Sequence, residues 1–279
     1  MTTFACVTTF SEDYYNKMAY AMIKTYKKFW PSDINLYVYL EDFTLPKEAK
    51  APNIIEYDIY EKCNPNLQAT LDWRGQHFTR GFLFKTYAFI HAVRNIKEDV
   101  IIYLDADSLT FKAIDKNWLL SLLPDNSLTA YMGVTMNKGN MKENAETCIF
   151  LFDKTHKGAK DFIDHYEHIY ESREIADTTR FEKPHDTWAF TECVQMAKTA
   201  GHMINDVNLH RKSQSPLRFT EFGKHFRHFK GKRKNDAELR TYLDMIMNEE
   251  SMKVIDRLIN KNKKDKNFST ASWYRKRLK

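Results

Sequence analysis

The stretch Val100-Ile101-Ile102-Tyr103-Leu104, followed at once by Asp105-Ala106-Asp107, decides the fold of this chain. Five consecutive apolar residues are typical of a strand that is buried on both faces of a parallel sheet. Strands and helices alternate in the residues before it, which indicates an α/β sheet covered by helices on both faces. Ligands bind beyond the carboxyl ends of the strands in such sheets, where Asp105 and Asp107 stand.

Further elements follow from hydrophobic periodicity on either side of this strand. Strands are expected over residues 4–7, 36–40, 54–57 and 147–152. A helix is expected after Ser11, a predicted N-cap, as far as Phe29, because apolar residues recur there every three or four positions until Pro31. More helices are expected over 82–93, 159–170, 187–198 and 237–260. We therefore predict one domain over residues 1–235 and a helical C-terminal extension over 236–279.

Composition excludes several classes of protein. The 279 residues are 43% hydrophobic with a net charge of +6, which is globular rather than disordered composition. Eight glycines are too few for a collagen-like chain. No apolar run approaches the ~20 residues of a membrane span, and residues 1–11 lack the pattern of a signal peptide. The four cysteines are scattered singly, so we expect no disulfide framework or zinc cage and a cytoplasmic location.

Basic residues are concentrated towards the C-terminus. Residues 223–279 contain 17 Lys and Arg against 7 Asp and Glu. Such asymmetry indicates an anionic partner, for which phosphates, nucleic acid and an acidic membrane surface all qualify. The alternative is a solvated helical tail.

Asp105 and Asp107 form the first candidate site. Side chains at positions i and i+2 of an extended chain point to the same side, so the two carboxylates can hold one hard cation, Mg²⁺ or Mn²⁺. The alternative is a solvated strand end with an N-capping aspartate. The apolar strand before the pair favours the metal.

Basic residues and a histidine form the second candidate site. His228 can complete a metal shell, Gly231 lets the backbone approach a phosphate, and Lys234 can neutralise that phosphate. The alternative is a basic surface loop, and His225 is a competing ligand. Lys85 stands in an apolar segment that can hold its stem against the core with its amine at the pocket; the alternative is a solvated lysine.

These motifs together resemble the metal-dependent glycosyltransferases of the GT-A fold, whose sheet is Rossmann-like and mostly parallel. The resemblance is closest to family 8, the retaining enzymes that include glycogenin-like and lipopolysaccharide galactosyltransferase-like proteins. It spans about residues 3–234 and rests on four segments: Val7-Thr8-Thr9 with Tyr14, Phe84-Lys85-Thr86-Tyr87, Ile102-Tyr103-Leu104-Asp105-Ala106-Asp107, and His228-x-x-Gly231-x-x-Lys234.

The resemblance implies transfer of a hexose or pentose from a UDP-sugar to a hydroxyl group, with retention. It implies the following site residues: Asp105, Asp107 and His228 on Mn²⁺ or Mg²⁺; Thr8, Thr9 and Tyr14 at the nucleoside; Lys85, Gly231 and Lys234 at the phosphates; and Asp186 and Glu146 orienting sugar or acceptor. Three segments depart from the family pattern: Glu146-Thr147-Cys148 replaces Asn-x-Gly, Asp186-Thr187 replaces Asp-Gln, and Lys234-Asn235-Asp236 replaces Lys-Pro-Trp. Asp186 is alternatively a plain helix N-cap.

Other partners and functions remain open at this point. The acceptor is a glycan or lipopolysaccharide, or DNA with hydroxymethylated bases bound by the basic C-terminal segment, and that segment also suits peripheral membrane contact. A nucleotidyltransferase acting on sugar phosphates is one alternative, although Thr8-Thr9-Phe10-Ser11 lacks the glycines of a phosphate loop. A non-catalytic binder of anionic polymers is another, and it explains the charge but not the motifs.

Overall fold

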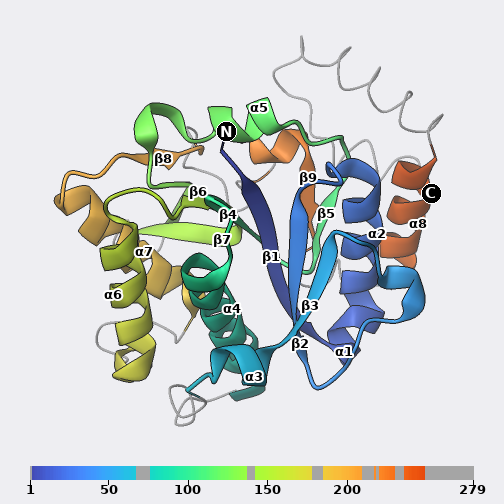
Figure 1. The fold of residues 1–279 in the computed structure, drawn as a ribbon, viewed down its shortest axis with the longest axis horizontal. Helices are drawn as coiled ribbons and strands as arrows, with labels where there is room; N and C mark the ends of the chain where they lie inside the picture. Colours follow the sequence, from blue (N-terminus) through green and yellow to red (C-terminus); the bar gives the residue numbers. More distant parts are fainter. Residues whose placement is uncertain are drawn as a thin grey trace. The chain divides into compact units, whose positions relative to one another are not determined.

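The computed structural model describes residues 2–66, 76–136, 142–177, 185–208, 217, 220–229 and 236–248. Within these residues seven strands form one sheet, and two short strands form a second (Figure 1). The large sheet consists of β1 (Phe4–Ser11), β2 (Asn35–Glu41), β3 (Ile54–Asp58), β4 (Val100–Leu104), β6 (Thr129–Met136), β7 (Lys142–Asp153) and β8 (Ile204–Asp206). The small sheet pairs β5 (Ser108–Thr110) with β9 (Phe226–His228).

The order of the large sheet is β3-β2-β1-β4-β7-β6-β8. Strands β1 to β4 are parallel to their neighbours in that group, whereas β7 runs antiparallel to both β4 and β6. The prediction of a mostly parallel α/β sheet is confirmed. The predicted strand over 147–152 is the second half of β7, and β5, β6, β8 and β9 were not predicted.

Helices cover the large sheet. They are α1 (Glu12–Tyr14), a π-helical turn (Tyr15–Ala19), α2 (Tyr20–Phe29), α3 (Ile59–Cys63), α4 (Gln76–Asn95), α5 (Lys116–Ser121), α6 (Ala159–Glu171) and α7 (Asp186–Thr199). Short 3₁₀ turns cover Lys47–Ala49, Pro124–Asn126, Glu174–Ala176 and Phe222–Lys224. The Ser11 hydroxyl accepts a hydrogen bond from the backbone N–H of Tyr14 at 3.3 Å, which confirms the predicted N-cap. The helix predicted over 82–93 is longer, since α4 begins at Gln76.

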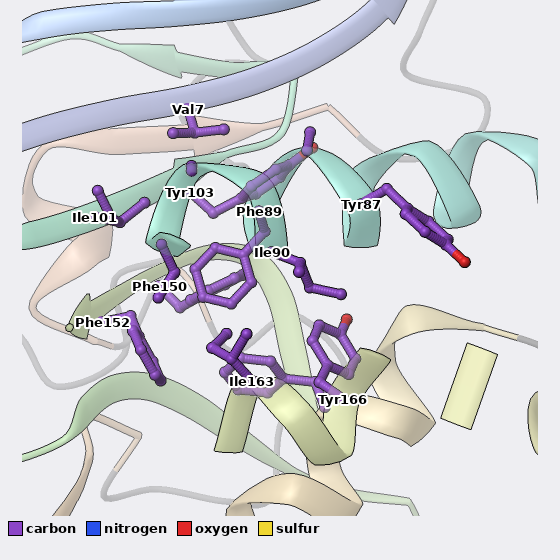
Figure 2. Packing of buried hydrophobic residues seen from close by; sticks show 14 of the residues in the cluster. Val7, Tyr87, Phe89, Ile90, Ile101, Tyr103, Phe150, Phe152, Ile163 and Tyr166 are labelled. Carbon is purple, nitrogen blue, oxygen red and sulfur yellow. The ribbon is translucent and has the colours of Figure 1, made fainter. Parts of the chain in front are cut away.

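Two apolar clusters lie on the two faces of the sheet. Successive residues of β1 point to opposite faces: Ala5 and Val7 join one cluster, whereas Phe4 and Cys6 join the other. The first cluster receives side chains from α4, α6 and α7, and the second receives them from α2. In the first cluster the ring of Phe89 lies 4.9 Å from that of Phe150, centroid to centroid (Figure 2). Burial on both faces explains why the strands read as continuous apolar runs.

The chain divides into two compact units, Met1–Lys232 and Arg233–Lys279. In the second unit the structure describes α8 (Asp236–Met247), on which Leu239, Leu243 and Ile246 recur with helical spacing and are buried. The rest of the predicted basic extension lies outside the described residues, so its helical structure stays a prediction. None of the helices described has both the length and the apolar composition needed to cross a bilayer.

Candidate metal centre

The carboxyl end of β4 and the small sheet bring the two candidate motifs together. The backbone N–H of Asp105 donates to the carbonyl oxygen of Cys148 at 2.8 Å, and a turn closes when the N–H of Ser108 donates to the Asp105 carbonyl, also at 2.8 Å. Ser108 then opens β5, where it pairs directly with His228 of β9. The N–H of Phe229 donates to the Asp107 carbonyl at 3.0 Å. The small sheet thus places the imidazole of His228 beside the two aspartates.

Side chains of Asp105, Asp107 and His228 converge. The Nε2 atom of His228 lies 2.9 Å from Asp107 Oδ1 and 3.7 Å from Asp105 Oδ2. One ligand atom from each of the three residues lies within 4.8 Å of the others. The side chains of Asp107 and His228 are 6% and 10% exposed, whereas that of Asp105 is 25% exposed, so the cluster is open at Asp105. Two carboxylates and one imidazole fit a hard divalent cation such as Mn²⁺ or Mg²⁺.

His225, the competing ligand, lies elsewhere. Its ring packs on the ring of Trp118 with the centroids 4.1 Å apart. It is not a member of the groups of potential metal ligands found among the described residues. The structure therefore favours His228 over His225.

Burial and charge shift the ionisation of the cluster. Burial lowers the pKa of His228, but Cys148 and Asp107 more than offset this effect, so the net pKa lies well above the usual range. Burial raises the pKa of the Asp105 carboxyl, and the neighbouring charge of Asp107 raises it further against the opposing effect of Lys85. Crowded acidic groups with little access to water are stabilised by a cation.

Lys85, on α4, is buried rather than solvated. Its Nζ atom lies 2.8 Å from Asp105 Oδ1 and 3.0 Å from Asp186 Oδ2, and it donates to the carbonyl oxygen of Thr147 at 2.6 Å. The ammonium also lies 4.8 Å from the centroid of the Tyr103 ring. Burial lowers the pKa of Lys85, but the two carboxylates more than offset it and the net pKa is raised. The solvated-lysine alternative is wrong.

Asp186 is completely buried as the first residue of α7. Its Oδ2 atom accepts from the Thr147 hydroxyl at 2.5 Å, and its Oδ1 atom lies 2.9 Å from His185 Nδ1. Burial raises the pKa of Asp186, but Lys85 and His185 more than offset it, so the pKa lies below its usual range. The N-cap of α7 is His185, whose Nδ1 atom lies 3.4 Å from the backbone nitrogen of Thr187. The N-cap alternative for Asp186 is therefore wrong.

The three residues predicted to contact the nucleoside, Thr8, Thr9 and Tyr14, have different surroundings. The Tyr14 hydroxyl donates to Asp107 Oδ2 at 2.8 Å, so Tyr14 contacts the candidate metal centre itself. Thr8 is buried in β1, and the Thr9 hydroxyl donates to the carbonyl oxygen of Tyr39 at 2.8 Å. Their contacts with a nucleoside stay predictions.

The remaining predicted residues lie at or beyond the edge of this site. Glu146, on β7, is partly exposed and offers a ligand atom within 4.8 Å of those of Cys148 and His228. Gly231 and Lys234, predicted at the phosphates, lie outside the described residues.

Besides the contacts of Tyr14 and Lys85 described above, three more in this region were not predicted. They are the approach of His185 to Asp186, the bond from Thr147 to Asp186, and the Cys148 thiol beside His228. In the sequence, His185 precedes Asp186, and Cys148 stands where the similar family has glycine. Neither feature by itself indicates a side-chain contact.

Comparisons with known proteins bear on the fold alone. No protein-family model matches the chain, and no curated protein is significantly similar to it. Among solved structures, the bifunctional glycosyltransferase WbbM in its apo form is similar with a TM-score of 0.51 and 14% identity, over 92% of this chain and 52% of that one. The glycosyltransferase GlyE of Streptococcus pneumoniae TIGR4 has a TM-score of 0.47 and 14% identity, over 75% of this chain and 47% of that one.

The galactosyltransferase LgtC, solved with donor and acceptor sugar analogues, has a TM-score of 0.46 and 14% identity, over 86% of this chain and 94% of that one. The chain spans about half the length of WbbM and of GlyE, 52% and 47%. Of these three similarities, that to WbbM has a TM-score above 0.5, so the fold rests on that comparison together with the sheet order above. The fold of this chain is that of the GT-A glycosyltransferases.

Proposed function

We propose that this protein is a metal-dependent glycosyltransferase of the family 8 type. It transfers a hexose or pentose from a nucleoside-diphosphate sugar, a UDP-sugar, to a hydroxyl acceptor with retention. The observation that carries the proposal is the convergence of Asp105, Asp107 and His228 at the carboxyl end of β4, in a GT-A fold. Ligands bind at this edge of an open α/β sheet.

Asp105, Asp107 and His228 would hold Mn²⁺ or Mg²⁺. The ion, when bound, supplies Lewis-acid stabilisation of the negative charge that develops on the departing diphosphate. Tyr14 holds Asp107 in place by donating to its Oδ2 atom, and Lys85 holds Asp105 by its ion pair at 2.8 Å. Both carboxylates are therefore oriented before any ligand arrives, which lowers the cost of binding.

Asp186 is a positioning residue in this proposal. Its side chain is fully buried, and it pairs at 3.0 Å with the ammonium of Lys85, which also pairs with Asp105. Glu146 is partly exposed, and it is the residue that we assign to orienting sugar or acceptor. A dedicated base is not required, because in a front-face transfer the departing phosphate takes the acceptor proton. Thr8 and Thr9 would then lie under the nucleoside, with Gly231 and Lys234 at the phosphates.

The acceptor is a glycan or lipopolysaccharide in the simplest form of the proposal. The basic residues of the C-terminal segment also suit DNA with hydroxymethylated bases, since phosphates attract lysine and arginine. An acceptor panel containing both classes separates these possibilities.

The test is a donor screen on the full chain with Mn²⁺. We expect slow hydrolysis of one UDP-sugar to free sugar and UDP, loss of that activity with a chelator, and a fall of at least ~100-fold in Asp107→Asn. Thermal unfolding of the variant verifies that its fold is intact. Incorporation of pyrophosphate into a nucleotide would instead identify a nucleotidyltransferase. Retention on anionic polymers, with no turnover of any donor, would identify a binding protein.

A further inference from the structure

The thiol of Cys148 lies beside His228 at the edge of the candidate metal centre, and the function proposed above makes no use of it. Cys148 is on β7, and its sulfur lies within 4.8 Å of a ring nitrogen of His228. Glu146 stands two positions earlier on the same strand, and side chains two apart on a strand share a face. The ligand atoms of Glu146, Cys148 and His228 lie within 4.8 Å of one another.

This second set of ligands differs chemically from the first. A carboxylate, a thiolate and an imidazole are three of the four ligands that a tetrahedral Zn²⁺ site requires. Asp105, Asp107 and His228 contain no sulfur and suit a harder ion. His228 belongs to both sets, so its imidazole is the group for which ions at the two positions compete.

We propose that Glu146, Cys148 and His228 form a second cation site, which takes Zn²⁺ and similar thiol-seeking divalent ions and competes with Asp105 and Asp107 for His228. As the ion binds, the proton of the Cys148 thiol passes to solvent, and a proton carried by the His228 nitrogen that binds the ion passes to solvent as well. The inference goes beyond sugar transfer, because it concerns an ion bound by the protein alone.

Another explanation for Cys148 is packing. Cys148 is 1% exposed, and a buried cysteine commonly acts as a small apolar residue with a weak S–H donor. Packing alone predicts that no metal bonds the sulfur. Co²⁺ distinguishes the two explanations, since it occupies zinc sites and a thiolate ligand gives it an intense sulfur-to-cobalt charge-transfer absorption.

The experiment is a Co²⁺ titration of the full chain under reducing conditions. We expect the charge-transfer band in the wild type, its loss in Cys148→Ser, and a weaker Co²⁺ affinity in Glu146→Gln. Cys193→Ser is the matched control, because Cys193 is equally buried but lies on α7 and joins no potential metal group among the described residues. Its band should be unchanged. Absence of the band in the wild type, or its persistence in Cys148→Ser, overturns the proposal.

Competition for His228 is tested with Mn²⁺, whose free concentration is read from its electron paramagnetic resonance signal. We expect Zn²⁺ to release bound Mn²⁺ from the wild type at concentrations at least ~10-fold lower than from Cys148→Ser. The reason is that removing a metal ligand weakens Zn²⁺ binding at least as much as removing a residue that hydrogen-bonds to a ligand. Equal concentrations would contradict competition through this site. Neither experiment contains a nucleotide sugar, so these results test the zinc site independently of glycosyl transfer.

Discussion

Tyr14 and Asp107 are joined by a hydrogen bond of 2.8 Å from hydroxyl to carboxylate. We expect Tyr14→Phe to bind Mn²⁺ at least ~10-fold more weakly, because an outer partner that orients a ligand typically contributes this much to metal affinity. Mn²⁺ titration followed by electron paramagnetic resonance measures the effect. Tyr15→Phe is the matched control, since burial and the charge of Glu48, rather than either aspartate, raise the pKa of Tyr15. Unchanged affinity in Tyr14→Phe would refute the positioning role.

Lys85 compensates two carboxylates, those of Asp105 and Asp186. We expect Lys85→Met to lower the free energy of unfolding by about 3–5 kcal/mol, because it leaves buried negative charge without a partner. Lys85→Met combined with Asp186→Asn should be less destabilised than the sum of the two single variants. Denaturant unfolding measures all three.

Lys198→Met is the control for lost packing of a lysine stem. The ammonium of Lys198 donates to the Tyr131 hydroxyl at 3.2 Å, a neutral partner. This variant should lose about 1 kcal/mol or less. Additive effects in the double variant of Lys85 and Asp186 would show that the two residues are not coupled.

The pH dependence of stability tests Asp186. Burial raises its pKa, but Lys85 more than offsets burial, so the carboxyl has a lower pKa in the fold than the ~3.9 of an unfolded chain. Such a group stabilises the fold above its unfolded pKa, and the contribution is lost as pH falls towards the folded pKa. We expect the urea midpoint to fall between about pH 5 and about pH 3, and to fall less steeply in Asp186→Asn. Equal slopes would contradict the ion pair.

At the scale of elements, β9 is the part of the fold that carries His228 to the aspartates. It contains three residues, and its hydrogen bonds are to the equally short β5. Phe226 anchors it, because this side chain is 3% exposed and its ring lies 6.0 Å from that of Trp30 and 6.1 Å from that of Trp118. The position of His228 therefore depends on the packing of Phe226, which lies two residues earlier on the same strand.

Phe226→Ala should separate this effect from general stability. We expect a loss of about 3–5 kcal/mol in unfolding free energy, together with Mn²⁺ affinity at least ~10-fold weaker because His228 is no longer held. Phe162→Ala, on α6 in the cluster on the other face of the sheet, should cost similar stability and leave Mn²⁺ affinity unchanged. An equal effect of both variants on affinity would mean that β9 has no special role.

At the scale of the whole molecule, the basic C-terminal segment is the feature to test. We expect truncation after Asn260 to leave UDP affinity nearly unchanged and to weaken retention on duplex DNA and on anionic vesicles. The lost positive charges are Lys261, Lys263, Lys264, Lys266, Arg275, Lys276, Arg277 and Lys279, against one lost negative charge, Asp265. The difference should shrink as salt rises, because contact with phosphates releases counterions. Identical retention of both proteins on both surfaces would leave the anionic partner without support.

The sequence alone determined the features that are encoded locally. The strand over 100–104 was predictable because five consecutive apolar residues indicate a strand buried on both faces of a sheet. The helices over 12–29 and 159–170 were predictable because their apolar residues recur with the helical period of 3.6. The two aspartates after β4 were predictable as a ligand site because the end of a parallel strand is one. Strands β5 and β9 were missed, since three residues carry no period and their pairing joins distant parts of the chain.

Only the tertiary structure decided which side chains meet. It buried Lys85 between two carboxylates, separated His228 from His225, and made His185 rather than Asp186 the cap of α7. It also placed the Cys148 thiol beside His228. Apart from the cap of α7, these contacts join residues far apart in the chain, and they depend on strand register and on how helices pack against the sheet. A local sequence pattern contains neither the strand register nor the helix packing, because both are set by the packing of the whole core.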